Sequence, residues 1–205
     1  EYLKPAPTRA DVLSCFAGIR PLSGEGTAAK TAKISREHRI DLASSGLITI
    51  TGGKWTTYRL MAEECVNMME KSLAIPGRKC LTKDLLIDEI ADQTQFDSYG
   101  GVATALAALV AENPELEKLI SPHLPYRQAE VVWAVRHEMA RSLMDILARR
   151  TRAIFLDAKA TIACAPTVGE ILRKELNKDS SWLNAQLETF ETQAADFVVS
   201  PPAQD

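Results

Sequence analysis

Cysteines, aromatic residues and long apolar runs are all scarce in this 205-residue sequence. Its four cysteines show neither Cys-x-x-Cys spacing nor the Cys/His spacing of a zinc site, so we expect free, buried thiols and no metal. No apolar run is long enough to cross a bilayer, and no secretory signal peptide is visible. The net charge of −3 argues against charge-driven binding to nucleic acid.

Several common catalytic and nucleotide-binding motifs are also absent. The sequence contains no GxSxG, HExxH, Walker or GxGxxG motif, so it gives no sign of a serine-hydrolase elbow, a zinc-protease helix or a phosphate loop. What it does contain is 46% hydrophobic and 25% charged residues, the balance of a folded globular protein.

Residues 1–75 have the pattern of a mixed α/β region. The β-branched and aromatic content of 11–19, closed by Arg20-Pro21, predicts a strand, and 34–42 predicts a second extended segment. A further strand is expected at 47–51, followed by a helix over 58–73 that ends before Ile75-Pro76-Gly77.

Residues 76–205 change character. After an extended link over 81–87, helical patterns occupy 101–112, 114–120, 126–155, 167–176 and 181–198. Short loops between amphipathic helices indicate an antiparallel bundle. We therefore predict an α+β chain of two units, 1–75 and 76–205, with the boundary between Leu73 and Leu86.

The segment Gly52-Gly53-Lys54 joins the expected strand at 47–51 to the expected helix at 58–73. Two glycines let a backbone approach a ligand closely, and the first N–H groups of a helix carry partial positive charge. Lys54 adds a full cation, so the segment favours an anionic ligand. The alternative is an ordinary strand-to-helix connection in which glycine supplies a positive φ.

Other charged residues could either bind a ligand or simply lie on the solvated surface. Arg20 could grip a phosphate or carboxylate bidentately, or it could be a solvated loop arginine. Arg36, His38 and Arg39 form a small basic cluster whose ordinary interpretation is a solvated face.

Beyond these spacings, several stretches resemble the FAD-dependent glycerol-3-phosphate dehydrogenases. The resemblance lies in residues 16–22, 34–38 and 45–63, and in 130–156, 167–172 and the region of Trp182. It covers most of the chain in the order in which the family has these stretches. It implies the C-terminal remnant of an FAD/substrate-binding α/β domain over 1–75, followed by an all-helical domain over 76–205.

The family resemblance also implies roles for individual residues. Lys54 resembles an active-site lysine near flavin and substrate, and Gly52, Gly53, Thr56 and Thr57 resemble flavin contacts. Arg20 resembles the arginine that grips the substrate phosphate, with Arg36 as a second cation. The reaction implied is oxidation of sn-glycerol 3-phosphate to dihydroxyacetone phosphate by hydride transfer to FAD, with electrons passing to quinone.

The family's dinucleotide fold and its proposed catalytic histidine would precede Glu1, so we expect an isolated chain that is inactive and binds FAD weakly. The complete enzyme is expected to be cytoplasmic and peripheral on the inner face of the membrane, and formation of a homo-oligomer is left open. Two alternatives remain open: a glycerol-3-phosphate oxidase that passes electrons to oxygen, and a non-catalytic helical interaction module.

Overall fold

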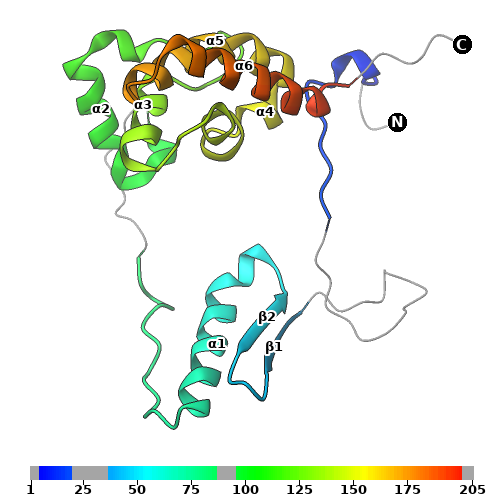
Figure 1. Cartoon of the computed structure of the whole chain (residues 1–205), viewed down its shortest axis with the longest axis vertical. Helices are drawn as coiled ribbons and strands as arrows, with labels where there is room; N and C mark the ends of the chain where they lie inside the picture. Colours follow the sequence, from blue (N-terminus) through cyan, green and yellow to red (C-terminus); the bar gives the residue numbers. More distant parts are fainter. Residues whose placement is uncertain (1–4, 20–36, 87–95, 200–205) are drawn as a thin grey trace, which may run out of the picture. The chain divides into compact units, whose positions relative to one another are not determined.

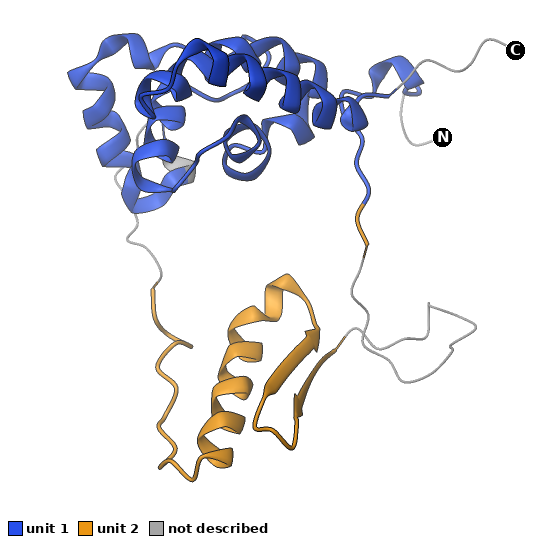
Figure 2. Cartoon of the chain, in the orientation of Figure 1, with its two compact units in different colours: residues 1–17, 88–205 blue, residues 18–87 orange. Residues whose placement is uncertain are grey.

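The computed structural model of this chain describes residues 5–19, 37–86 and 96–199. Its elements fall into two units, which Figures 1 and 2 show: one comprises residues 18–87, and the other comprises 1–17 together with 88–205. Arg20 and Arg36, the two arginines predicted to bind phosphate, lie outside the described residues.

The unit formed by residues 18–87 contains a β-hairpin followed by a helix. Strands β1 (His38–Leu42) and β2 (Ile48–Gly52) pair antiparallel, with His38 opposite Gly52 and Ile40 opposite Ile50. A short 3-10 helix, η3 (Trp55–Thr57), leads into α1 (Tyr58–Ser72). The strand predicted at 47–51 and the helix predicted at 58–73 are thus confirmed within one residue at each end, and β1 occupies the described part of the extended segment at 34–42.

Burial differs sharply between the two units. No residue of the described stretch 37–86 is buried, and large apolar side chains such as Trp55 and Leu81 are 87% and 78% exposed. The hairpin and helix therefore have partly covered side chains, but residues 37–86 form no hydrophobic core among themselves.

The other unit is helical. It contains η4 (Asp97–Val102), α2 (Ala103–Glu112), η5 (Pro114–Glu117), α3 (Gln128–His137), the π-helical turn η6 (Asp145–Arg150), α4 (Ala153–Leu156), α5 (Ala158–Glu175), α6 (Ser180–Ala194) and η7 (Ala195–Phe197). Helix α5 packs against α3, α4 and α6. The larger core cluster includes Val131, Leu143, Ile146, Leu172 and Phe190, and a smaller one forms around Leu106. The predicted dominance of helices after residue 98 is confirmed for the described residues.

The long helix predicted over 126–155 is wrong. Helix α3 ends at His137, and the Arg141 guanidinium donates to the carbonyls of Val135 and Ala140 near that end. The Asp145 carboxylate then accepts the backbone N–H groups of Arg141 and Ser142, which starts a new helical segment. Left-handed backbone at Met139 and Arg152 marks the two breaks in the expected helix.

The helix predicted to begin at Thr167 begins much earlier. Helix α5 starts at Ala158, where the Asp157 carboxylate accepts the Ala160 N–H, and it runs through Pro166. The same type of cap starts α6, where Asp179 accepts the N–H of Trp182. Burial of the first turns of α5 outweighs the local preference of proline for a helix start.

The strand predicted at 11–19 is also wrong. Residues 9–11 form a 3-10 turn and 12–19 have no regular structure. The segment instead packs on the helical unit through Phe16, whose ring meets Phe155 edge-on at 4.9 Å. Hydrogen bonds hold it there, among them Ala158 N–H to the Leu13 carbonyl, Cys15 N–H to the Phe197 carbonyl, and the Ser14 hydroxyl to the Ile154 carbonyl.

The bounds of the two units in the structure differ from the predicted division at residue 75. Residues 1–17 belong with the helices, and 76–87 belong with the hairpin unit. The functional assignment of 1–75 to a flavin/substrate domain stays a prediction. All four cysteines are free, as expected, but Cys164 alone is buried and Cys15 is exposed.

A buried carboxylate in α3 bonds to Tyr99 of η4 within the helical unit. Glu130, 5% exposed in α3, accepts the Tyr99 hydroxyl at 2.8 Å and the Arg127 N–H at 2.5 Å. Loss of water raises the pKa of Glu130, although the Arg127 N–H and the Tyr99 hydroxyl oppose the shift. The same loss of water, with the nearby Glu130 charge, raises the pKa of Tyr99 well above its ordinary range.

Candidate active site

The turn from β2 into α1 has the conformation that its two glycines allow. Gly52 and Gly53 have φ of 72° and 83°, values that side chains with a Cβ rarely adopt. A Cβ on Gly53 would lie 2.6 Å from the Met61 Sδ and 3.1 Å from the His38 Cβ. The turn therefore needs glycine at position 53 for both its backbone angles and its space.

Lys54 begins the helical run. Its N–H donates to the Thr57 hydroxyl at 3.3 Å, and that hydroxyl donates to the Lys54 carbonyl at 3.0 Å. These two bonds close the first turn and hold the backbone of Lys54 in place. The Thr57 hydroxyl therefore serves the turn itself, a local role that the sequence prediction of a flavin contact did not include.

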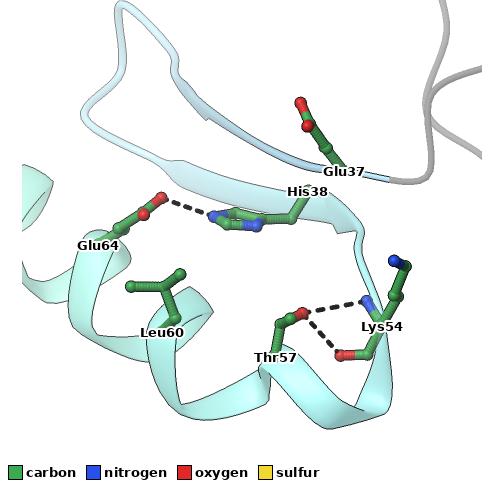
Figure 3. Close-up of a pocket in the computed structure, with 6 residues that line it drawn as sticks. All are labelled: Glu37, His38, Lys54, Thr57, Leu60 and Glu64. Carbon is green, nitrogen blue, oxygen red and sulfur yellow. Dashed lines mark hydrogen bonds and ion pairs between the residues drawn. The ribbon is translucent and has the colours of Figure 1, made fainter.

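Lys54 and Thr57 line a cleft of about 400 Å³, together with Glu37, His38, Leu60 and Glu64. Figure 3 shows these six side chains around the space between β1, the Gly-Gly turn and the start of α1. Thr56 is exposed in η3 and is not among the residues that line the cleft. The structure thus brings Lys54, Thr57 and the glycine turn together at one place.

The charges in this cleft are mixed. Lys54 provides one ammonium group, and Glu37 and Glu64 provide two carboxylates. In the described part of the chain no ion pair involves Lys54, whose side chain is exposed.

A pair that sequence reasoning missed crosses the cleft. The His38 Nε2 lies 2.7 Å from the Glu64 Oε2, joining β1 to α1. In the sequence His38 stands in a basic cluster, and nothing in the spacing of 26 residues signals this partner.

A second groove, of about 690 Å³, runs between α1 and residues 78–85. Arg59 spans it, donating to the Glu63 carboxylate at 2.6 Å and to the Thr82 hydroxyl at 3.2 Å. The hydrogen bond that Arg59 donates to Glu63 is the main cause that raises the pKa of Arg59. This arginine ties the extended link to the helix.

Residues 5–19, 37–86 and 96–199 contain no cluster of three or more His, Cys, Asp or Glu side chains that could hold a metal ion. Among the helices in those ranges, none has both the length and the hydropathy needed to span a membrane.

Comparison with known proteins covers both units. Residues 48–182 match the family described as the C-terminal domain of alpha-glycerophosphate oxidase. The chain belongs to this family. The matched range of this alpha-glycerophosphate oxidase C-terminal domain begins in β2, includes Gly52, Gly53 and Lys54, and ends in α6.

Individual relatives agree with the family assignment. The chain is 34% identical to a mitochondrial glycerol-3-phosphate dehydrogenase of Arabidopsis thaliana over 100% of its own length and 38% of that protein. It is 35% identical to the mitochondrial glycerol-3-phosphate dehydrogenase of Bos taurus, covering 88% of the chain and 28% of the relative. A probable mitochondrial glycerol-3-phosphate dehydrogenase of Dictyostelium discoideum is 38% identical over 76% of the chain and 28% of the relative. The chain thus spans about a third of the length of these relatives.

Proposed function

We propose that this chain is the C-terminal part of a flavoenzyme that oxidises sn-glycerol 3-phosphate to dihydroxyacetone phosphate, with FAD as hydride acceptor and quinone as the next electron acceptor. The observation that carries the proposal is the position of Lys54. It stands at the end of the glycine turn, in a cleft, within the range matched to the alpha-glycerophosphate oxidase C-terminal domain. The relatives, which are glycerol-3-phosphate dehydrogenases by name, suggest the substrate class.

The residues at the turn fit one edge of a flavin. The Gly52–Gly53 backbone leaves no Cβ in the way of a ring, and the first N–H groups of the helix have no acceptor inside it. FAD, when bound, would accept a hydride from the substrate carbon that bears the hydroxyl group. Lys54 and the helix N-terminus would then favour the negative charge that the flavin gains.

Arg20 and Arg36 complete the proposal as the cations that bind the substrate phosphate. The resemblance of residues 16–22 and 34–38 to the glycerol-3-phosphate dehydrogenases supports this part. Arginine provides the planar fork that phosphate binding favours. Gly52, Gly53, Thr56 and Thr57 are proposed to border the flavin, Thr57 by holding the turn.

The test uses the complete enzyme that carries this chain. Arg20→Ala should chiefly raise the KM for glycerol 3-phosphate, whereas Lys54→Ala should lower kcat as well. Each lost charge-assisted contact is expected to cost about 2–4 kcal/mol of transition-state stabilisation. Wild-type values for both variants would show that these residues do not form the site.

The family description favours one alternative acceptor. It names an oxidase, whereas the relatives are named dehydrogenases. Quinone reduction measured beside peroxide production by the complete enzyme separates the two. A quinone-linked enzyme must reach the lipid phase, so we propose peripheral attachment to the inner face of a membrane.

The chain alone is proposed to bind FAD weakly and to lack dehydrogenase activity, because it has no dinucleotide phosphate loop. Titration of the 205-residue chain with FAD, followed by flavin fluorescence, tests this. Saturable micromolar binding with turnover of glycerol 3-phosphate would contradict it.

A further inference from the structure

His38 occupies the position from which a side chain can influence the glycine turn most directly. It lies opposite Gly52 in the β1–β2 ladder, at the end of the hairpin where the turn begins. Its Cβ also lies within 3.1 Å of the place where a Cβ on Gly53 would be. The side chain is 15% exposed, so it is largely enclosed by the hairpin, the turn and α1.

Glu64 holds the imidazole from the other side of the cleft. The 2.7 Å contact between Nε2 and the carboxylate fixes the rotation of the ring. Glu64 follows Leu60 by one turn of α1, and both side chains line the cleft. Figure 3 shows the imidazole lying between β1 and α1, with Nε2 directed at Glu64.

The pair therefore connects α1, which follows the segment that carries Lys54, to β1, which pairs with the strand β2 that precedes this segment. Strand β2 is held through the pairing of His38 with Gly52, and α1 is held through Glu64. Between them, Lys54 is bonded to Thr57 through its backbone alone. A shift of β1 relative to α1 would move the Lys54 side chain with the turn.

An ordinary surface ion pair would behave differently. The Arg39–Asp41 pair lies on the same strand at the same 2.7 Å, but both side chains are about half exposed and both belong to β1. Such a pair cross-links no elements and contributes little. Asp41 and Glu64 have nearly equal exposure, 48% and 47%, which makes Asp41 a matched control.

We propose that His38 and Glu64 are positioning residues that hold the Gly52–Gly53 turn so that Lys54 faces the reacting groups. This role rests on the proposed function. A misplacement of about 1 Å in a catalytic group can cost about 100-fold in rate. The pair acts on the placement of Lys54, so its loss should lower kcat more than it changes KM.

The experiment compares Glu64→Ala, Glu64→Gln and Asp41→Ala in the complete FAD-loaded enzyme. Glutamine keeps an oxygen that accepts the imidazole N–H, so it should restore what alanine removes. Turnover is expressed per bound FAD, which removes any loss that comes from poorly folded protein. Hydrogen exchange of the Lys54 amide gives a second readout that does not depend on activity.

The expected result for Glu64→Ala is a fall in kcat per FAD of about 10- to 100-fold, with KM within about twofold and faster exchange at the Lys54 amide. Glu64→Gln and Asp41→Ala should resemble the wild type. An unchanged kcat per FAD in Glu64→Ala, or the same loss in Glu64→Gln, would overturn the positioning role alone. A wild-type enzyme that holds no FAD and does not oxidise glycerol 3-phosphate would overturn the proposed function and this inference together.

Discussion

Ile146 and Ile40 carry the same side chain in two very different surroundings. Ile146 is completely buried in the helical core, whereas Ile40, in β1, is only partly covered. The contrast extends to both units, since the helices enclose two core clusters and the described residues 37–86 enclose none. The proposed catalytic elements thus lie in the less buried unit.

The residues that stabilise the fold and the residues of the proposed active site thus lie in different units. The helical unit has the buried apolar area that keeps a domain folded, and it also holds residues 13–16. The hairpin unit has the glycine turn and Lys54 but little buried area. Under the proposed function, we expect it to gain further contacts within the complete flavoenzyme.

The largest expected difference in stability is between alanine substitutions of the two isoleucines. Ile146→Ala should lower the free energy of unfolding of the helical unit by about 2–5 kcal/mol, because it leaves a cavity in a closed core. Ile40→Ala should cost less than about 1 kcal/mol. Urea denaturation followed by circular dichroism measures both, and equal costs would remove the contrast between the units.

A smaller and local effect is expected at two glycines of the hairpin unit. Gly46 and Gly53 both have positive φ, but a Cβ on Gly46 meets nothing within 4 Å, whereas one on Gly53 meets Met61. Gly46→Ala should cost about 1–2 kcal/mol of local stability, and Gly53→Ala should cost more. Hydrogen exchange over residues 46–61 measures the effect, and exchange in α5 should not change.

If both glycine variants destabilise the hairpin unit equally, the contact with Met61 contributes nothing to the turn. If either variant accelerates exchange in α5, the two units are not energetically separate.

The smallest effects concern pH and lie within the helical unit. Burial raises the pKa of Glu130 above 4.5, so the folded state keeps this proton at pH values where the unfolded state has lost it. The contribution of Glu130 to stability therefore falls as pH rises above 4.5. Glutamine does not titrate, so the Glu130→Gln variant lacks this pH-dependent loss of stability. The free energy of unfolding of the variant, compared with that of the wild type, should therefore improve as pH rises.

Asp145 should show the opposite sign. Desolvation would raise its pKa, but hydrogen bonds from the Arg141 N–H, Ser142 and Arg149 outweigh it and hold the pKa below 3.8. Its contribution is present above pH 3.8 and is lost as pH falls through the lowered value. The loss of unfolding free energy caused by Asp145→Asn should therefore become smaller at low pH. Urea denaturation of Glu130→Gln, Asp145→Asn and the wild type at several pH values between 3 and 7 tests both predictions. If the difference in unfolding free energy from the wild type changed with pH in the same direction for both variants, the opposite pKa shifts of Glu130 and Asp145 would be contradicted.

Local signals explain what could be predicted from the sequence. The apolar run into Gly52-Gly53 and the periodic apolar positions after Tyr58 lie within short windows, and β2 and α1 were placed correctly. The β-branched and aromatic content of 11–19 is equally local, but the Leu13 carbonyl and the Cys15 N–H bond to Ala158 and Phe197, which lie far away in the sequence. Such long-range partners leave no trace in spacing.

Two further features depended on single side chains. The apolar period continues through 126–155, and the break comes from Arg141 and Asp145 bonding to backbone groups. The partnership of His38 with Glu64 depends on how β1 and α1 approach each other. The bond of the Thr57 hydroxyl to the Lys54 backbone was not predicted either, because Lys54 followed three residues later by Thr57 does not match the Ser/Thr-x-x-Glu/Gln pattern of a capping box.

Hydrogen exchange of the 205-residue chain tests the contrast between the two units most directly. Amides in α3, α5 and α6 should exchange only when the helical unit unfolds as a whole, whereas those in β1, β2 and α1 should exchange several orders of magnitude faster. Protection of the hairpin and α1 equal to that of α5 would contradict the account, because it would show that residues 18–87 are as stably folded in this chain as the helical core.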